Sequence, residues 1–107
     1  MSRLEQLENM LAADPDDAFL NFALGMEYVK EGRHDDAIAQ FKRVNTLNPD
    51  YVSAYFQQGN VYIAMKQSGA AKEILTQGVA VAQRVGDRHA ASQMRDLLAV
   101  LNTSSGE

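Results

Sequence analysis

The chain has 107 residues, of which 46% are hydrophobic and 22% are charged, and its formal net charge is −4. This length fits one small domain with a single core, and no apolar run approaches the ~18 residues that a membrane-spanning helix needs. The absence of cysteine excludes disulfides and thiolate metal clusters, and the acidic balance disfavours nucleic acid, whose phosphates are bound by clustered Lys and Arg.

The N-terminal segment, residues 1–13, is predicted to form a capping helix. Ser2 and Glu5 have the spacing of a capping box, and Leu4, Leu7 and Leu11 follow on one helical face. Because charged residues are mixed with the apolar ones, the segment does not look like a secretory signal, and we expect a cytoplasmic protein.

Residues 14–47 are predicted to form a first pair of helices. The segment Asp14-Pro15-Asp16-Asp17 stops one helix and starts the next, because proline fits the first turn of a helix and acids suit its positive end. This second helix continues to about residue 31, where Gly32 supplies a stop that tolerates left-handed backbone. The acids of Asp35-Asp36 then open the third helix.

Residues 48–85 are predicted to form a second pair on the same plan. Asn48-Pro49-Asp50 repeats the earlier stop-and-start chemistry, and the fourth helix reaches about Lys66. Ser68 is expected to cap a fifth helix. That helix runs unusually far, to residue 85, because Gln83 stands where proline stood in the earlier pair.

The last ordered segment, residues 86–102, is predicted to form a C-terminal capping helix. Gly86 ends the fifth helix, and Asp87 caps a sixth helix that spans about residues 88–101. Residues 103–107 are polar and have nothing to bury, so we expect a disordered tail.

The register of the sixth helix is left open. A strict repeat would turn polar side chains toward the core, namely His89, Gln93 and Asp96. A slip of about one residue would bury apolar ones instead, namely Ala90, Met94 and Leu97. A slip of about five residues would bury Met94, Leu98 and Leu101.

An internal repeat links the two helix pairs. The same residue types recur at an offset of about thirty-four residues, the period of a helical repeat. The matched positions are Gly25 and Gly59, Tyr28 and Tyr62, Ala37 and Ala71, and Phe41 and Leu75. The apolar residues keep helical spacing throughout and β-branched runs are missing, so the fold class is predicted to be all-α.

These residues resemble the tetratricopeptide repeat (TPR). The signature positions of one repeat hold Leu24, Gly25, Tyr28, Ala37, Phe41, Val44 and Pro49, and those of a second hold Tyr55, Gly59, Tyr62, Ala71, Leu75 and Gly78. The resemblance implies about six helices in one domain, residues 1–102, in which antiparallel helix pairs stack as a short right-handed solenoid. Asn21 and Gln58 depart from the family pattern, which has large apolar residues there.

The resemblance also implies that the first helix of each pair lines a concave groove that binds a partner. The groove-facing positions are Phe19, Phe22, Met26, Val29 and Lys30 in the first pair, and Phe56, Asn60 and Ile63 in the second. This apolar surface must be covered by something. Neighbouring helices of the chain, a peptide segment of another protein, and a second copy in a two-fold dimer all remain open.

The function expected from the resemblance is a non-enzymatic protein–protein interaction module, with a self-associating homodimer as the alternative. No residues are arranged as a nucleophile with its base or as a phosphate-binding loop, so we expect no catalytic site and no cofactor. His34 and His89 lie beside acids that are better explained as helix starts, and no metal is expected. The family's carboxylate clamp for chaperone tails is absent, because Phe22, Met26 and Gln57 occupy its positions.

Overall fold

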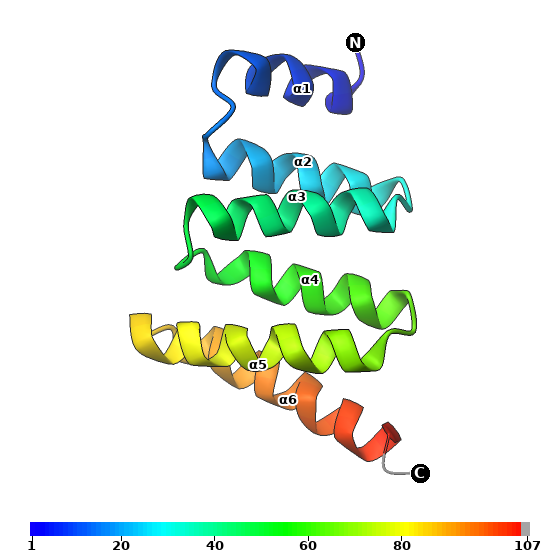
Figure 1. Cartoon of the computed structure of the whole chain (residues 1–107), viewed down its shortest axis with the longest axis vertical. Coiled ribbons are helices and arrows are strands. Elements are labelled where there is room, and N and C mark those ends of the chain that lie inside the picture. Colours follow the sequence, from blue (N-terminus) through cyan, green and yellow to red (C-terminus); the bar gives the residue numbers. More distant parts are fainter. Residues whose placement is uncertain (106–107) are drawn as a thin grey trace. The chain divides into compact units, whose positions relative to one another are not determined.

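The computed structural model describes residues 1–105, and within them it contains six α-helices and no strand (Figure 1). The helices are α1 (Arg3–Ala13), α2 (Ala18–Lys30), α3 (His34–Leu47), α4 (Val52–Ala64), α5 (Ser68–Val85) and α6 (Arg88–Ser105). They divide into a first unit, Met1–Pro49, which holds α1 to α3, and a second unit, Asp50–Glu107, which holds α4 to α6. The predicted all-α class with six helices is confirmed.

Polar side chains begin three of the helices. The Ser2 hydroxyl and the carboxylates of Asp17 and Asp87 each accept a hydrogen bond from the backbone N–H three residues further on, at 3.1, 2.9 and 3.1 Å. Such caps satisfy amides that have no partner inside the helix. The predicted cap at Ser68 is wrong, because Ser68 is already the first residue of α5 and the preceding Gln67 makes no capping hydrogen bond with its side chain.

The turns within the two helix pairs use left-handed backbone at corresponding positions. Gly32, between α2 and α3, has φ 71°, and Lys66, between α4 and α5, has φ 61°. Gly86, which ends α5, has φ 83° as predicted for a C-terminal glycine stop. Left-handed backbone is uncommon for a residue with a Cβ, so the conformation of Lys66 was not predictable from its identity.

In the first unit, Gly25 forms a notch on α2 that receives the ring of Phe41 from α3. A Cβ atom added at Gly25 would lie only 2.6 Å from Phe41 Cε1. Phe41 is completely buried, and the ring of Phe22 lies 5.5 Å from its ring, centroid to centroid. The repeated glycine is therefore a packing residue, which allows a large side chain to fill the space between two helices.

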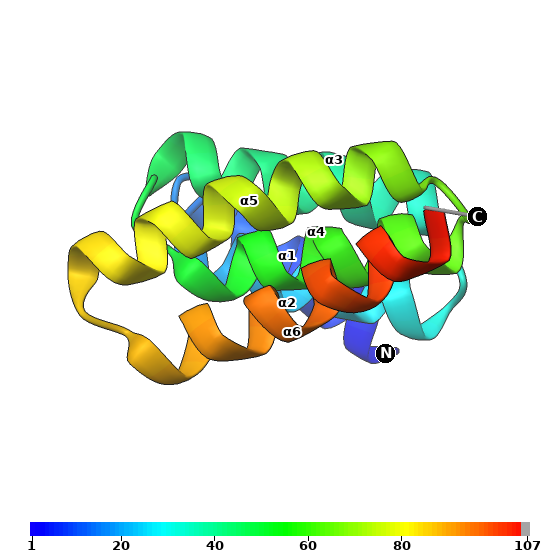
Figure 2. The same ribbon diagram turned by 90° about the horizontal axis from the view of Figure 1, so that it is seen from below.

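The second unit uses the same device twice. The Leu75 side chain of α5 occupies the notch at Gly59 of α4, and the Met94 sulfur of α6 would lie 2.5 Å from a Cβ at Gly78 of α5. In all three pairs the large residue follows its glycine by sixteen positions. Figure 2 shows α6 running back along α5 from the turn that joins them. The third notch thus attaches the C-terminal helix to the second repeat.

The register of α6 is set by this attachment. The buried side chains of α6 are Ala91, Met94 and Leu101, while Leu97 and Leu98 are partly buried against the same core cluster. Burial of Met94 and Leu101 agrees with the slip of about five residues, and Gln93 is exposed, which rules out the strict repeat. The slip follows from the length of α5, which at 18 residues is longer than α3 with 14.

The C-terminal tail differs from the prediction. Residues 103–105, which were expected to be disordered, continue α6, and only residues 106–107 of the expected tail lie outside the described residues. Leu101 is 8% exposed and fixes the last part of the helix to the core, and the Thr103 hydroxyl donates to the Ala99 carbonyl at 2.9 Å. The buried Leu101 therefore anchors the last turns of α6, and the helix continues beyond this last apolar residue.

Asn21, a departure from the family pattern, is a buried hydrogen-bonding residue. It is 1% exposed, and its Nδ2 donates to the carbonyls of Pro15 and Asp17 at 3.1 and 2.8 Å. Its Oδ1 accepts from Nε2 of Gln40 on α3. Because a buried polar group costs free energy unless it is paired, this network explains how an amide occupies a position expected to be apolar, and it fixes the entry of the chain into α2.

Tyr28, a second signature residue, lies beneath an arginine of the same unit. The Arg33 guanidinium carbon is 4.5 Å from the centroid of the Tyr28 ring. Burial raises the pKa of the Tyr28 hydroxyl, and the positive charge of Arg33 partly opposes this effect.

Replacing Tyr28 by phenylalanine is expected to reduce the loss of stability at high pH. In the unfolded chain the hydroxyl ionises near pH 10.0, whereas in the fold its pKa is higher. The un-ionised Tyr28 hydroxyl therefore contributes fully to the free energy of unfolding below pH 10.0. This contribution is lost as the pH rises through the folded pKa, because the hydroxyl of the unfolded state releases its proton first. Phenylalanine keeps the ring beneath Arg33 and removes the hydroxyl. Urea unfolding at about pH 9 and about pH 11 should show a smaller decline for the variant, and an equal decline would contradict the assignment.

Candidate functional site

The predicted contact residues of the first unit lie on α2 and form what we call the α2 stripe, Phe19, Phe22, Met26, Val29 and Lys30. Phe19 is 66% exposed, whereas Phe22, Met26 and Val29 are half-buried. Lys30 is exposed, and its Nζ lies 3.4 Å from Oε2 of Glu27. The core-facing side of the same helix carries Asn21, Leu24 and Gly25, which are buried. Phe19 is thus the one member of the stripe that presents a large apolar side chain mostly to water.

Phe22 belongs to both the core and the stripe. Its ring lies 5.5 Å from the buried ring of Phe41, with an angle of 48° between the ring planes. Aromatic pairs at this separation are stabilising beyond the area that they bury. A charged residue at Phe22 would therefore disturb the fold as well as the surface, so a loss of binding in such a variant would not identify a binding residue.

The predicted contact residues of the second unit, Phe56, Asn60 and Ile63, lie on α4 and form the α4 stripe. All three are half-buried, and Phe56 and Ile63 pack against the core cluster of their unit. In this unit α6 also contacts α4. Neighbouring helices therefore cover part of the α4 stripe, which leaves its apolar members less accessible than Phe19.

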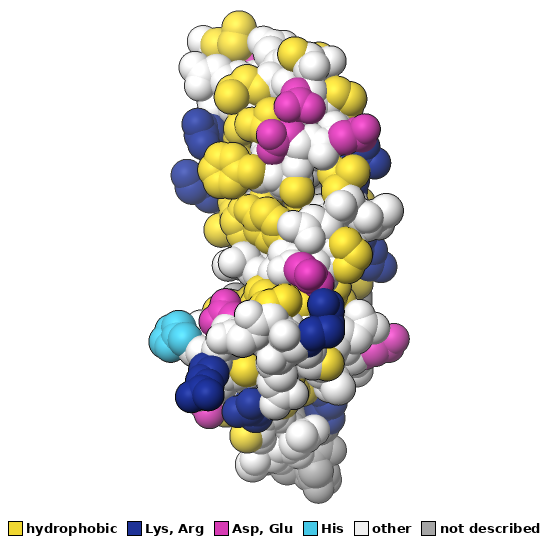
Figure 3. All heavy atoms as spheres, turned by 90° about the vertical axis from the view of Figure 1, so that its left-hand side faces the viewer, with side chains coloured by type: hydrophobic (Ala, Val, Ile, Leu, Met, Phe, Trp, Pro, Cys, Tyr) yellow, Lys and Arg dark blue, Asp and Glu magenta, His cyan; other side chains and the backbone are white. Residues whose placement is uncertain are grey.

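The first unit, which carries the α2 stripe, has an excess of acidic side chains. The first unit contains nine acidic and five basic side chains, whereas residues 50–105 contain four acidic and five basic ones. Figure 3 shows one face of the molecule, on which hydrophobic side chains of the first unit, in its upper part, gather beside acidic ones. The net negative charge of the protein thus resides in the unit that carries the exposed Phe19.

Neither a metal cluster nor a membrane span is found in the part of the chain that the structure describes. No three residues of the types His, Cys, Asp and Glu come together there as metal ligands would. None of the described helices combines enough length with enough apolar character to cross a bilayer. His34 is half-buried at the start of α3, and His89 is exposed near the start of α6.

The comparison of sequences decides the family. Residues 25–66 match a model described as TPR repeat, and residues 52–84 match a model described as tetratricopeptide repeat. A TPR repeat-containing protein of Pseudomonas aeruginosa is 31% identical over 99 residues, which cover 92% of this chain and 94% of that protein. The chain belongs to the TPR family.

Solved structures of other proteins share the fold of this TPR protein. A protein of Bordetella parapertussis has a TM-score of 0.86 at 26% identity, and the match covers 97% of this chain and 90% of that one. The first TPR of Spaghetti, solved bound to the HSP90 peptide SRMEEVD, has a TM-score of 0.81 at 16% identity and covers 97% of this chain and 78% of its own. At that identity the second likeness concerns the fold alone. TPR proteins are in general non-enzymatic interaction modules.

Sequence reasoning did not predict a hollow in the second unit, between the end of α5 and the first turns of α6. Its lining includes Arg88 and Arg95, which lie seven residues apart and so on one face of α6. That spacing is visible in the sequence. The spacing alone does not predict a hollow, because the other side of the hollow is formed by Gln83 of α5 and by the turn at Gly86.

Proposed function

We propose that this TPR protein is a non-enzymatic module that binds an apolar peptide segment of another protein through the α2 stripe. The observation that carries the proposal is Phe19, a large aromatic side chain that is 66% exposed on a helix whose opposite side is core. Phe22, Met26 and Val29 continue the apolar surface from Phe19 as half-buried neighbours. The peptide bound to the first TPR of Spaghetti supports a peptide as the class of partner.

The α4 stripe is proposed as an additional contact surface. Its half-buried Asn60 can donate to and accept from the backbone of a bound segment, and Phe56 and Ile63 add apolar surface beside it. Because these two side chains also pack against the core of their unit, we expect them to contribute less to binding than Phe19.

Charge indicates the composition of the partner. The first unit has nine acidic side chains against five basic ones, and Glu27 lies beside Lys30, the basic residue of the stripe. A unit with a net negative charge attracts segments with positive charge. We therefore expect a partner segment with one or more bulky apolar residues next to Lys or Arg.

Replacing Phe19 by aspartate is expected to weaken binding of such segments at least about tenfold without unfolding the protein, because it removes an exposed aromatic anchor. Val100→Asp is the matched control, since Val100 is 63% exposed and lies in the other unit. Peptides selected from a displayed library by the wild type should bind the control equally well. Retention of the same peptides by Phe19→Asp at unchanged affinity would contradict the proposal.

The alternative of a homodimer is an outcome of the same experiment. Light scattering of the wild type at two concentrations should report a monomer if the stripe is free for peptides. A dimer that Phe19→Asp dissociates and Val100→Asp does not would identify a second copy of the chain as the cover of the α2 stripe.

A further inference from the structure

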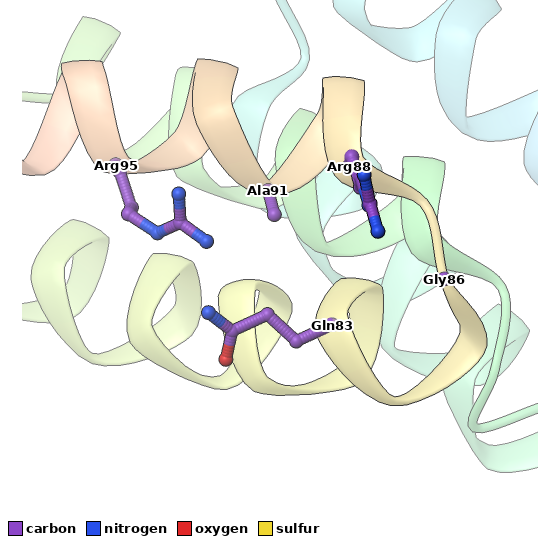
Figure 4. A pocket seen from close by; sticks show the side chains of 5 residues that line it. All are labelled: Gln83, Gly86, Arg88, Ala91 and Arg95. Atoms are coloured by element: carbon purple, nitrogen blue, oxygen red, sulfur yellow. The ribbon is translucent and has the colours of Figure 1, made fainter.

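The second unit contains a hollow of about 450 Å³ between α5 and α6. Its walls are formed by Gln83 and Gly86 at the end of α5 and by Arg88, Ala91 and Arg95 on α6. In Figure 4 the side chains of Gln83 and Arg95 point toward one another across the space between the two helices, and Arg88 extends from the start of α6 toward α5. The hollow shares no residue with either stripe, since α2 and α4 supply none of its lining residues.

The two arginines of the hollow differ from the other arginines that are placed beside acids. Arg33, Arg43 and Arg84 pair with Asp36, Asp16 and Asp50 at 2.9, 2.8 and 2.6 Å. In the part of the chain that the structure describes, the side chains of Arg88 and Arg95 form no ion pair and no hydrogen bond. Two guanidinium groups therefore border one hollow, and neither has an acidic partner within residues 1–103.

The acids nearest in sequence, Asp87 and Asp96, form no ion pair with these arginines among the described residues. The Asp87 carboxylate accepts the hydrogen bond from Ala90 N at 3.1 Å that caps α6, and Asp96 is not among the residues that line the hollow. Residues 50–105 contain five basic and four acidic side chains, so the second unit does not repel anions as the first unit does.

The geometry of the helix allows both arginines to act together. A separation of seven residues is two turns, so their Cα atoms lie about 10 Å apart on one face of α6. Ala91, between them, is buried and short, which leaves the space between the two long side chains open. Each guanidinium can hold a carboxylate or phosphate with two parallel hydrogen bonds, and the Gln83 amide can donate a further one from the opposite wall.

We propose that the hollow lined by Gln83, Arg88 and Arg95 binds an oxyanion group, a carboxylate of an acidic peptide or a free phosphate. The two arginines supply the charge, and Gln83 orients the bound group from α5. This site is independent of the proposed function, because none of its lining residues belongs to either stripe and its ligand has a charge opposite to that expected for the partner of the α2 stripe.

The test is a titration of the ¹⁵N-labelled protein at constant ionic strength, followed by backbone amide and arginine Nε shifts. One arm uses inorganic phosphate and the other an acetylated, amidated Glu-Glu-Asp-Glu peptide. We expect saturable shifts confined to Gln83–Arg95, and at least tenfold weaker binding in the variant with Arg88→Gln and Arg95→Gln. Saturation by the peptide alone would identify a carboxylate-bearing partner, whereas saturation by phosphate as well would identify a general oxyanion site.

The matched control is the double variant Arg3→Gln and Lys42→Gln, which removes the same charge from exposed positions of the first unit. It should bind as the wild type does, and circular dichroism should show equal helicity for both double variants. Shifts that rise linearly without saturation, or equal weakening in the control, would mean general charge screening and would overturn the proposal.

Discussion

Replacing Gly25 by leucine is expected to unfold the first unit of this TPR protein. Even the first added atom, Cβ, would lie 2.6 Å from Phe41 Cε1, and the Phe41 ring is fully buried and packed against the Phe22 ring. An aromatic ring held on both sides cannot move aside as the end of a flexible side chain can. We expect the free energy of unfolding to fall by about 3 kcal/mol or more through overpacking, measured by urea unfolding with far-UV circular dichroism.

The control for this prediction is Gly69→Leu. Gly69 lies near the start of α5, and a Cβ added there would meet no atom within 4 Å. Leucine at this exposed helical position should leave stability unchanged or raise it by up to about 1 kcal/mol, because glycine is the poorer helix former. If Gly25→Leu unfolded at the same urea concentration as Gly69→Leu, the notch would not be a packing site.

A double-mutant cycle isolates the contact itself. Gly25→Ala adds only the clashing Cβ, and Phe41→Leu replaces the ring that it meets. If the two side chains share one space, the double variant should be more stable than the sum of the single effects predicts. Additive effects would place the cost of Gly25→Ala elsewhere.

The repeat and its packing were largely predictable from the sequence, because no other residue type can replace glycine at its two close helix contacts. Glycine in a helix is costly unless a neighbour needs the space, so Gly25 and Gly59 at one offset indicate two equivalent helix contacts. Their partners Phe41 and Leu75 are marked by the same offset. The family and the core of the two repeats follow from these positions.

Features that depend on how one segment meets another were less predictable. The prediction that Ser68 caps α5 was wrong. The left-handed backbone of Lys66 could not be predicted from the lysine side chain. Asn21 is tolerated in the core because Pro15 and Asp17, in the connection between α1 and α2, and Gln40 on α3 supply its hydrogen-bond partners. A departure from the family pattern indicates an altered environment, and only the fold reveals which groups compensate it.

The sequence predicted which residues of the candidate site share a helix face, but it did not predict how much of each side chain is exposed. Helical spacing places Phe19 and Phe22 on one side of α2, yet Phe19 is 66% exposed and Phe22 packs on Phe41. The exposure of a side chain depends on which neighbouring helices cover it. The periodicity of a single helix gives no information on this. The stripe residues remain predicted contacts, with Phe19 the most informative position to test.

Met94→Ala is expected to destabilise the second unit by about 2–5 kcal/mol, the cost of truncating a fully buried methionine and leaving a cavity. Met94 is completely buried, and its sulfur occupies the notch at Gly78. Both apolar registers considered from the sequence bury Met94, so this variant does not distinguish between them. The two registers differ in which leucine they bury, and the variants that distinguish them are Leu101→Ala and Leu97→Ala. Leu101 is 8% exposed, while Leu97 is only partly buried against the core cluster.

We therefore expect Leu101→Ala to cost more than Leu97→Ala, because more of the Leu101 side chain is removed from water on folding. Val100→Ala, at a position that is 63% exposed on the same helix, should change the free energy of unfolding by no more than about 0.5 kcal/mol. Leu97 and Leu101 are four residues apart and therefore lie only about 40° apart around the helix, so the reverse order of the two leucines would require α6 to be turned by about that angle. Such a rotation would also move Arg88 and Arg95 by about 40°, so the order of these unfolding free energies independently tests the face of α6 on which the proposed oxyanion site depends.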